Sequence, residues 1–214
     1  MEIKSINILG TSEPTLTMIF DNLESNTCFP EIYLLNNLGK TDWMKFENGL
    51  FHINLITSLE KLNPNFLFFL GVNKPINKQK ILQLIDGEAY DFTTIVNKTA
   101  FISSTATLGK GVNINSLVSI AGYSQIGDFV SINRNASVGH HTQINEFVTI
   151  NPGANIAGFV KIGKGTLIGM GVNVVENIEI GANSIIGAGA LVTKNIPDNV
   201  IAYGNPCKII RSNE

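Results

Sequence analysis

Two adjacent histidines are the residues of this chain whose type and position most suggest chemistry. His140 and His141 interrupt the run from Ala136 to Ile144, which has no other ionisable side chain, and the 214-residue chain has three histidines in all. A neutral imidazole with an ordinary pKa can take up a proton near pH 7, and such a general base is commonly worth about 10² to 10⁴ in rate. The pair is therefore a candidate general base, and an exposed, solvated histidine is the ordinary alternative.

The histidine pair lies within a six-residue repeat. Every sixth residue from Ile102 to Val192 is aliphatic, and no position breaks the register. Neither an α-helix nor an alternating strand has this period, whereas a prism of short strands with one corner per hexad does. Three hexads make one coil, so about five coils are predicted and residues 18 apart stack on one another. The residue after each aliphatic is usually Gly, Ala or Asn, which we expect to form the corners. His140 lies two residues past the inward Val138, so its ring should project outward from such a corner.

Composition excludes several classes of function. The net charge of −2 and pI near 5.9, with no local cluster of Lys and Arg, argue against a nucleic-acid partner. Only 15% of residues are charged, against about 25% in an average soluble domain, so polar uncharged side chains or other subunits must cover the surface. The N-terminus lacks a signal-peptide pattern, and no apolar run could span a membrane, so we expect a cytoplasmic protein without membrane insertion. Cys28 and Cys207 fit no metal-ligand spacing, which predicts reduced thiols and no metal.

The first 96 residues have a different pattern. Apolar runs at 6–10, 31–35, 66–71 and 92–96 alternate with helix-like segments at 15–23 and 77–85. Short, nearly continuous apolar strands separated by helices are typical of a parallel sheet that is covered on both faces. The chain therefore divides into a small Rossmann-like α/β domain over 1–96 and a repeat domain over 97–214.

The repeat motif, [LIV]-[GAN]-x-x-[STAV]-x, resembles that of the hexapeptide-repeat acyltransferases. The order of the two domains, the closing run at 186–197 and the segment Gly204-Asn205-Pro206-Cys207-Lys208 are similar to sugar acyltransferases of the sialic acid O-acetyltransferase type. That family includes N-acetyltransferases of UDP-linked 4-amino sugars in bacillosamine synthesis and of GDP-perosamine. The resemblance implies a left-handed parallel β-helix for 97–214, a homotrimer with active sites between subunits, and acetyl-CoA as the cosubstrate without a metal. It also implies an acceptor-binding role for residues 1–96.

The resemblance assigns catalytic roles to three residues. His140 falls on the family's catalytic base, and His141 stands where the family most often has an acidic residue that orients this base. Either another group fixes the tautomer of His140, or His141 is itself the base. Gly158 lies 18 residues after His140 and matches a glycine whose N–H is thought to hold the thioester carbonyl, although a simple corner residue is the equal alternative. Such a donor commonly raises the reaction rate by 10²-fold or more.

The resemblance also implies binding residues for both substrates. Those for acetyl-CoA are Gly187, Ala188, Gly189, Lys194 and Lys208. Those for the acceptor are Gly10, Thr11, Ser12, Asn36, Asn37, Asn73 and Thr149.

The acceptor site departs from the family pattern. Only Gly10 remains of the glycine-rich loop, Glu13 adds a negative charge where a diphosphate should bind, and Asn77 replaces an arginine. Pro14 still suits the first turn of a helix. Despite these departures, the resemblance as a whole implies acetyl transfer to the amine of a nucleotide-linked amino sugar for surface glycan. The alternatives are O-acetylation of sialic acid or another small acceptor, and a non-catalytic trimeric scaffold.

Overall fold

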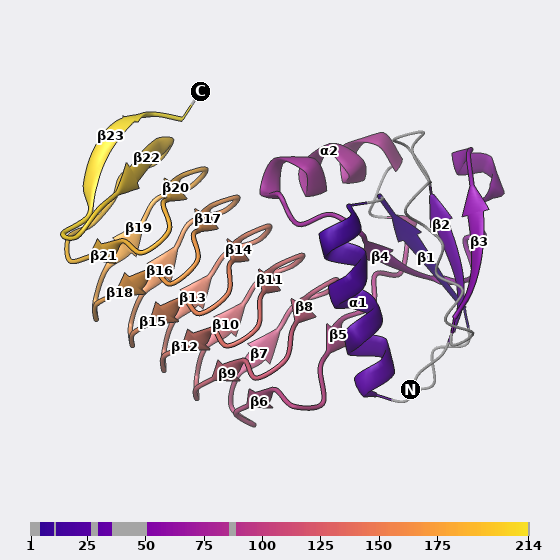
Figure 1. The fold of residues 1–214 in the computed structure, drawn as a ribbon, viewed down its shortest axis with the longest axis horizontal. Coiled ribbons are helices and arrows are strands. Elements are labelled where there is room, and N and C mark those ends of the chain that lie inside the picture. Colours follow the sequence, from indigo (N-terminus) through magenta and orange to yellow (C-terminus); the bar gives the residue numbers. More distant parts are fainter. Residues whose placement is uncertain (1–4, 11, 27–29, 36–50, 86–88, 214) are drawn as a thin grey trace.

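The chain forms a small α/β region followed by a long parallel β-helix (Figure 1). This computed structural model describes residues 5–10, 12–26, 30–35, 51–85 and 89–213. Four parallel strands form the first sheet in the order β3-β2-β1-β4, with α1 and α2 packed beside it. The bounds of these elements are β1 Ser5–Leu9, α1 Glu13–Ser25, β2 Glu31–Leu35, β3 His52–Ile56, the 3₁₀ turn η1 Leu59–Lys61, β4 Leu67–Leu70 and α2 Pro75–Ile85.

Most elements predicted for the first region are confirmed, and two details differ. Strand β3 is missing from the prediction, because it lies at the sheet edge and only Ile56 among its residues is buried. The predicted strand at 92–96 is divided: Phe92 bridges Phe68 of β4, whereas Ile95–Val96 forms β5 and pairs with β8 of the β-helix. The first coil thus begins at Ile95, and the division into independent domains at residue 96 stays a prediction.

The β-helix has three faces, each a parallel sheet of two-residue strands. The first face consists of β5 Ile95–Val96, β8 Asn113–Ile114, β11 Ser131–Ile132, β14 Thr149–Ile150, β17 Leu167–Ile168 and β20 Ile185–Ile186, and it ends in the hairpin β22 Val200–Tyr203 and β23 Lys208–Ser212. The second face consists of β6 Phe101–Ile102, β9 Ser119–Ile120, β12 Ser137–Val138, β15 Asn155–Ile156, β18 Asn173–Val174 and β21 Leu191–Val192. The third face consists of β7 Thr107–Leu108, β10 Gln125–Ile126, β13 Gln143–Ile144, β16 Lys161–Ile162 and β19 Glu179–Ile180. Partners across each ladder are 18 residues apart, as the hexad arithmetic predicts.

The inward aliphatic residues form one continuous core from Val112 to Ala202. The corner glycines act differently from the prediction. From Leu108 to Ile186, the left-handed backbone occurs three residues after each aliphatic, for example at Tyr123 and His141, and not directly after it. Glycines in the predicted position, such as Gly127 and Gly169, are required because a side chain there would collide with the backbone of the next coil. Their role is close approach between coils.

Two buried polar side chains join the α/β region to the first face of the β-helix. Asn22 of α1 donates to Asn113 Oδ1 at 2.9 Å, and Asn97 Nδ2 donates back to Asn22 Oδ1 at 2.9 Å. Lys78 of α2 is 1% exposed, and its Nζ donates to the Phe129 carbonyl at 2.9 Å and to Ser131 Oγ at 2.8 Å. Burial lowers the pKa of Lys78 from 10.5 to about 7. The α/β region is therefore fixed to the β-helix by specific hydrogen bonds as well as by apolar contact.

Candidate active site

His140 and His141 occupy a corner between the second and third faces, in the turn that joins β12 to β13. Both side chains are exposed, which confirms that neither is a core histidine. The backbone of this corner is fixed from both sides. His141 N–H donates to Gly122 O at 3.1 Å in the preceding coil, and Phe159 N–H donates to His140 O at 2.9 Å from the following coil. The pair therefore sits on a rigid support.

The His140 ring packs directly against Gly158, one coil further along the same corner. An ideal Cβ on Gly158 would lie 2.7 Å from Cε1 and 2.9 Å from Nε2 of His140, where ordinary contact begins at 3.4 Å. Only glycine leaves room for the imidazole in this position. Within the part of the chain that the structure describes, the Gly158 N–H donates to no protein acceptor. A proton acceptor and a backbone donor thus lie side by side.

The two imidazoles contact each other through their Nδ1 atoms, which are 3.2 Å apart. Their planes are nearly perpendicular, at 86°, with ring centroids 5.3 Å apart. The His140 ring also meets the Phe159 ring edge to face at 5.0 Å. His141 stacks between Tyr123, at 4.9 Å, and Phe159, also at 4.9 Å. These three rings come from consecutive coils and form the aromatic ladder.

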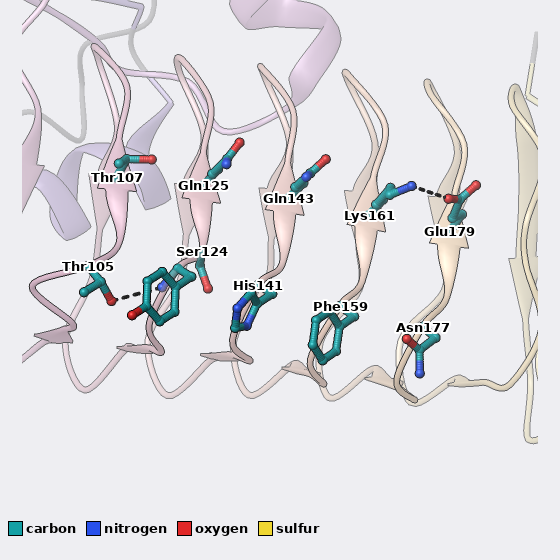
Figure 2. A pocket seen from close by; sticks show the side chains of 11 residues that line it. Thr105, Thr107, Ser124, Gln125, His141, Gln143, Phe159, Lys161, Asn177 and Glu179 are labelled. Carbon is teal, nitrogen blue, oxygen red and sulfur yellow. Dashed lines mark hydrogen bonds and ion pairs between the residues drawn. The ribbon is translucent and has the colours of Figure 1, made fainter.

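A groove runs along this corner and the third face (Figure 2). Its volume is about 610 Å³. Figure 2 shows His141 and Phe159 along one side and the side chains of Gln125 and Gln143 along the other. Further along, Lys161 Nζ pairs with Glu179 Oε1 at 2.7 Å. The residues that line the groove are Thr105, Thr107, Tyr123, Ser124, Gln125, His141, Gln143, Phe159, Lys161, Asn177 and Glu179.

The residues predicted to bind acetyl-CoA lie on two different edges of the prism. Lys194 follows β21 on the same edge as His140, three coils further along, which at about 4.8 Å per coil is on the order of 14 Å. Gly187, Ala188 and Gly189 lie instead between β20 and β21, on the edge where the first and second faces meet. Lys208 begins β23, in the terminal hairpin of the first face. Within one chain these residues do not form a single groove.

Two of the predicted acceptor residues, Gly10 and Ser12, lie directly before α1. Gly10 follows β1 and lies against Gly71, and Ser12 N–H donates to Gly71 O at 3.2 Å. Ser12 is the N-cap residue of α1, and its side chain makes no capping hydrogen bond. Asn73 lies in the neighbouring loop before α2. Thr11, Asn36 and Asn37 lie outside the described residues.

Thr149 does not line a site. Its side chain is fully buried under α2, where Oγ1 donates to Asn73 O at 2.6 Å and accepts from Lys78 Nζ at 3.1 Å. The predicted contact of this hydroxyl with the acyl donor or acceptor therefore has no support from the structure. The sequence prediction also missed Lys78, although α2 offers a signal: Lys78 falls on the helix face that buries Pro75, Ile81 and Ile85.

Comparisons with known proteins agree with this architecture. Residues 159–194 match the family described as bacterial transferase hexapeptide (six repeats). The acetyltransferase domain of PglB from Neisseria gonorrhoeae FA1090 has a similar structure, with a TM-score of 0.87 and 24% identity over 97% of this chain and 100% of that chain. The chain therefore has the fold of this acetyltransferase domain.

Two other solved structures have the same fold over nearly the whole chain. A histidine-to-asparagine mutant of perosamine N-acetyltransferase from Caulobacter crescentus, in complex with CoA and GDP-perosamine, has a TM-score of 0.82 and 24% identity, covering 97% of each chain. WeeI from Acinetobacter baumannii AYE has a TM-score of 0.79 and 20% identity, covering 97% of this chain and 100% of that chain. No curated protein sequence matches this chain. The predicted fold class, a small parallel α/β region followed by a parallel β-helix, is confirmed.

The described residues lack two other kinds of feature. No helix there is long and apolar enough to cross a membrane. No group of three or more His, Cys, Asp and Glu side chains there is arranged to hold a metal ion.

Proposed function

We propose that this chain is an acetyl-CoA-dependent acetyltransferase that transfers the acetyl group directly to the amine of a nucleotide-linked amino sugar. The packing of His140 on Gly158 is the observation that carries the proposal. An exposed imidazole lies beside a backbone N–H that has no protein acceptor among the described residues, on a corner of the fold found in a solved acetyltransferase domain. One structure of that domain contains acetyl coenzyme A.

The reaction needs two functions from these residues. As the amine nitrogen attacks the thioester carbonyl, His140 takes a proton from that nitrogen, and the Gly158 N–H donates to the oxygen that becomes negative. When the C–S bond then breaks, the electron pair leaves with sulfur, and His140 returns its proton to the CoA thiolate. The products are an acetamido sugar and CoA, and the imidazole regains its starting state.

We propose that the working enzyme is a homotrimer with the site between subunits. Within one chain, Gly187 to Gly189 lie on a different edge from His140, so one CoA molecule could contact both sets only where two protomers meet. The two edges also carry exposed apolar side chains, Tyr123 and Phe159 on one and Leu117 and Met170 on the other. Contact between unlike edges is heterologous, and cyclic symmetry closes it.

The acceptor nucleotide would bind where α1 begins. Gly10 allows close approach of the backbone, and the amino end of α1 favours an anionic group such as a diphosphate. Ser12 and Asn73 lie at the same end of the sheet and are the polar side chains we assign to this acceptor.

The test is release of CoA thiol by the full-length protein with acetyl-CoA and a panel of UDP-, GDP- and dTDP-linked amino sugars, with mass spectrometry of the products. We expect thiol release with at least one amino sugar and none with the matched hydroxy sugar. No release with any acceptor would contradict the activity, whereas release with only hydroxy sugars or free sialic acid would replace N-acetylation by O-acetylation. Acetyl-CoA that gives no protection against thermal unfolding would favour the scaffold alternative.

A further inference from the structure

The Nδ1 contact between His140 and His141 determines which nitrogen of His140 can accept a proton. Two nitrogens 3.2 Å apart form a favourable contact only when one carries the hydrogen and the other accepts it. A neutral imidazole has one N–H and one lone pair. If His140 donates from Nδ1, its Nε2 is free to act as a base. If His140 accepts at Nδ1, its Nε2 carries the hydrogen and the ring cannot take up a proton there.

The surroundings of His141 fix the orientation of its ring. The stack between Tyr123 and Phe159 holds both faces of this ring, with interplanar angles of 28° and 19°, so its Nδ1 stays directed at His140. Among the described residues, no carboxylate is hydrogen-bonded or ion-paired with either histidine. The neighbouring imidazole is therefore the group in contact with the inner nitrogen of His140.

The position of Gly158 distinguishes the two rings. His140 is the imidazole that packs on this glycine, with Nε2 2.9 Å from where a Cβ would be. His141 has both faces covered by rings of the aromatic ladder. Nε2 of His140 can therefore reach a thioester that is bound at Gly158.

We propose that His141 is the positioning residue of this site: its Nδ1 accepts the Nδ1–H of His140 and so fixes the tautomer whose Nε2 is unprotonated. This inference rests on the proposed function for its catalytic meaning. During transfer, Nε2 takes the proton of the amine, and the Nδ1–H of the resulting imidazolium stays hydrogen-bonded to His141. The second imidazole thereby replaces a carboxylate with a neutral acceptor.

The direct test reads the tautomers and needs no acceptor substrate. With ¹⁵N-labelled histidine, the chain gives signals from only three residues, and His52→Asn assigns one of them. At neutral pH we expect His140 to be protonated on Nδ1 and His141 on Nε2. The variant His141→Phe keeps a ring in the stack but removes the acceptor, so the preference of His140 for Nδ1–H should disappear. Protonation of His140 on Nε2 in the wild-type protein would overturn the inference, whatever the activity of the protein.

The kinetic test separates positioning from structure. We expect His141→Phe to lower kcat by at least about tenfold, a part of the 10² to 10⁴ that a base supplies, with an unchanged KM for acetyl-CoA. His141→Asn, whose side-chain oxygen can accept a hydrogen bond, should recover most of this loss.

Three kinetic results would contradict either the positioning role of His141 or the proposed function. Wild-type kcat in His141→Phe would overturn the positioning role. Equal inactivity of His141→Asn and His141→Phe would do the same and would favour His141 as the base. Wild-type activity in His140→Ala would overturn the proposed function instead, and the tautomer measurement would still decide the positioning role.

Discussion

The contact between Gly158 and His140 makes a sharp prediction for Gly158→Ala. The added methyl would lie 2.7 Å from Cε1 of His140, and ordinary contact begins at 3.4 Å, so the ring must retreat by about 0.7 Å. A misplacement of about 1 Å can cost 10²-fold in rate, so we expect kcat/KM to fall by about 10- to 100-fold. The backbone of Gly158 is outside the left-handed region, and the displaced ring is exposed, so stability should change by no more than about 0.5 kcal/mol.

The assay is steady-state release of CoA thiol, with thermal unfolding followed by circular dichroism. Gly122→Ala is the matched control, because Gly122 occupies the same corner one coil before His140 and its added methyl would meet Thr105 Oγ1 at 2.8 Å instead of the imidazole. The control should keep near wild-type activity. Wild-type kcat/KM in Gly158→Ala would refute the claim that a glycine is needed at this position to leave room for the imidazole of His140. Loss of folding in Gly158→Ala would refute it as well, since it would make the glycine a structural corner residue.

Three further predictions follow from the buried contacts and the edge that carries His140. Because the pKa of Lys78 falls to about 7 on folding, the free energy of unfolding of the wild type should rise with pH between about 7 and 10.5, by at most about 1.4 kcal/mol per pH unit. Urea unfolding at several pH values measures this rise. It should be lost in Lys78→Met and kept in the exposed control Lys80→Met. Asn22→Leu leaves buried amide groups unpaired, so urea unfolding should show a loss of about 1 to 3 kcal/mol; an unchanged midpoint would contradict the docking role. Lys194→Ala should raise the KM for acetyl-CoA up to about fivefold with kcat unchanged, whereas Lys61→Ala, at an exposed position in the α/β region, should change neither; equal kinetics of the two variants would remove Lys194 from the CoA site.

The hexad pattern made the β-helix predictable because each strand contributes one inward residue, and the spacing alone gives the coil. The same arithmetic placed Gly158 above His140, and it could also have revealed the aromatic ladder, since Tyr123, His141 and Phe159 are 18 residues apart. What the arithmetic cannot give is the direction of each ring. The Nδ1 contact between the histidines depends on the left-handed backbone of His141, which residue type does not specify.

The interface between the α/β region and the β-helix could not be predicted from the sequence, for a different reason. Lys78 and Asn22 are single polar residues on amphipathic helices, and sequence patterns treat such residues as solvated. Their partners, among them Ser131 and Asn113, lie more than 50 residues away on the first face of the β-helix. Thr149 was assigned to the acceptor site by the family resemblance, and only the folded chain shows that it is buried under α2.

The most direct test of the central claim compares acetyl-CoA binding and turnover in His140→Asn. The variant removes the base but keeps a small polar side chain against Gly158. We predict a dissociation constant for acetyl-CoA equal to that of the wild type and a fall in kcat of about 10² or more with the acceptor that the panel identifies. Turnover at the wild-type rate, with acetyl-CoA bound equally well, would contradict the assignment of His140 as the base.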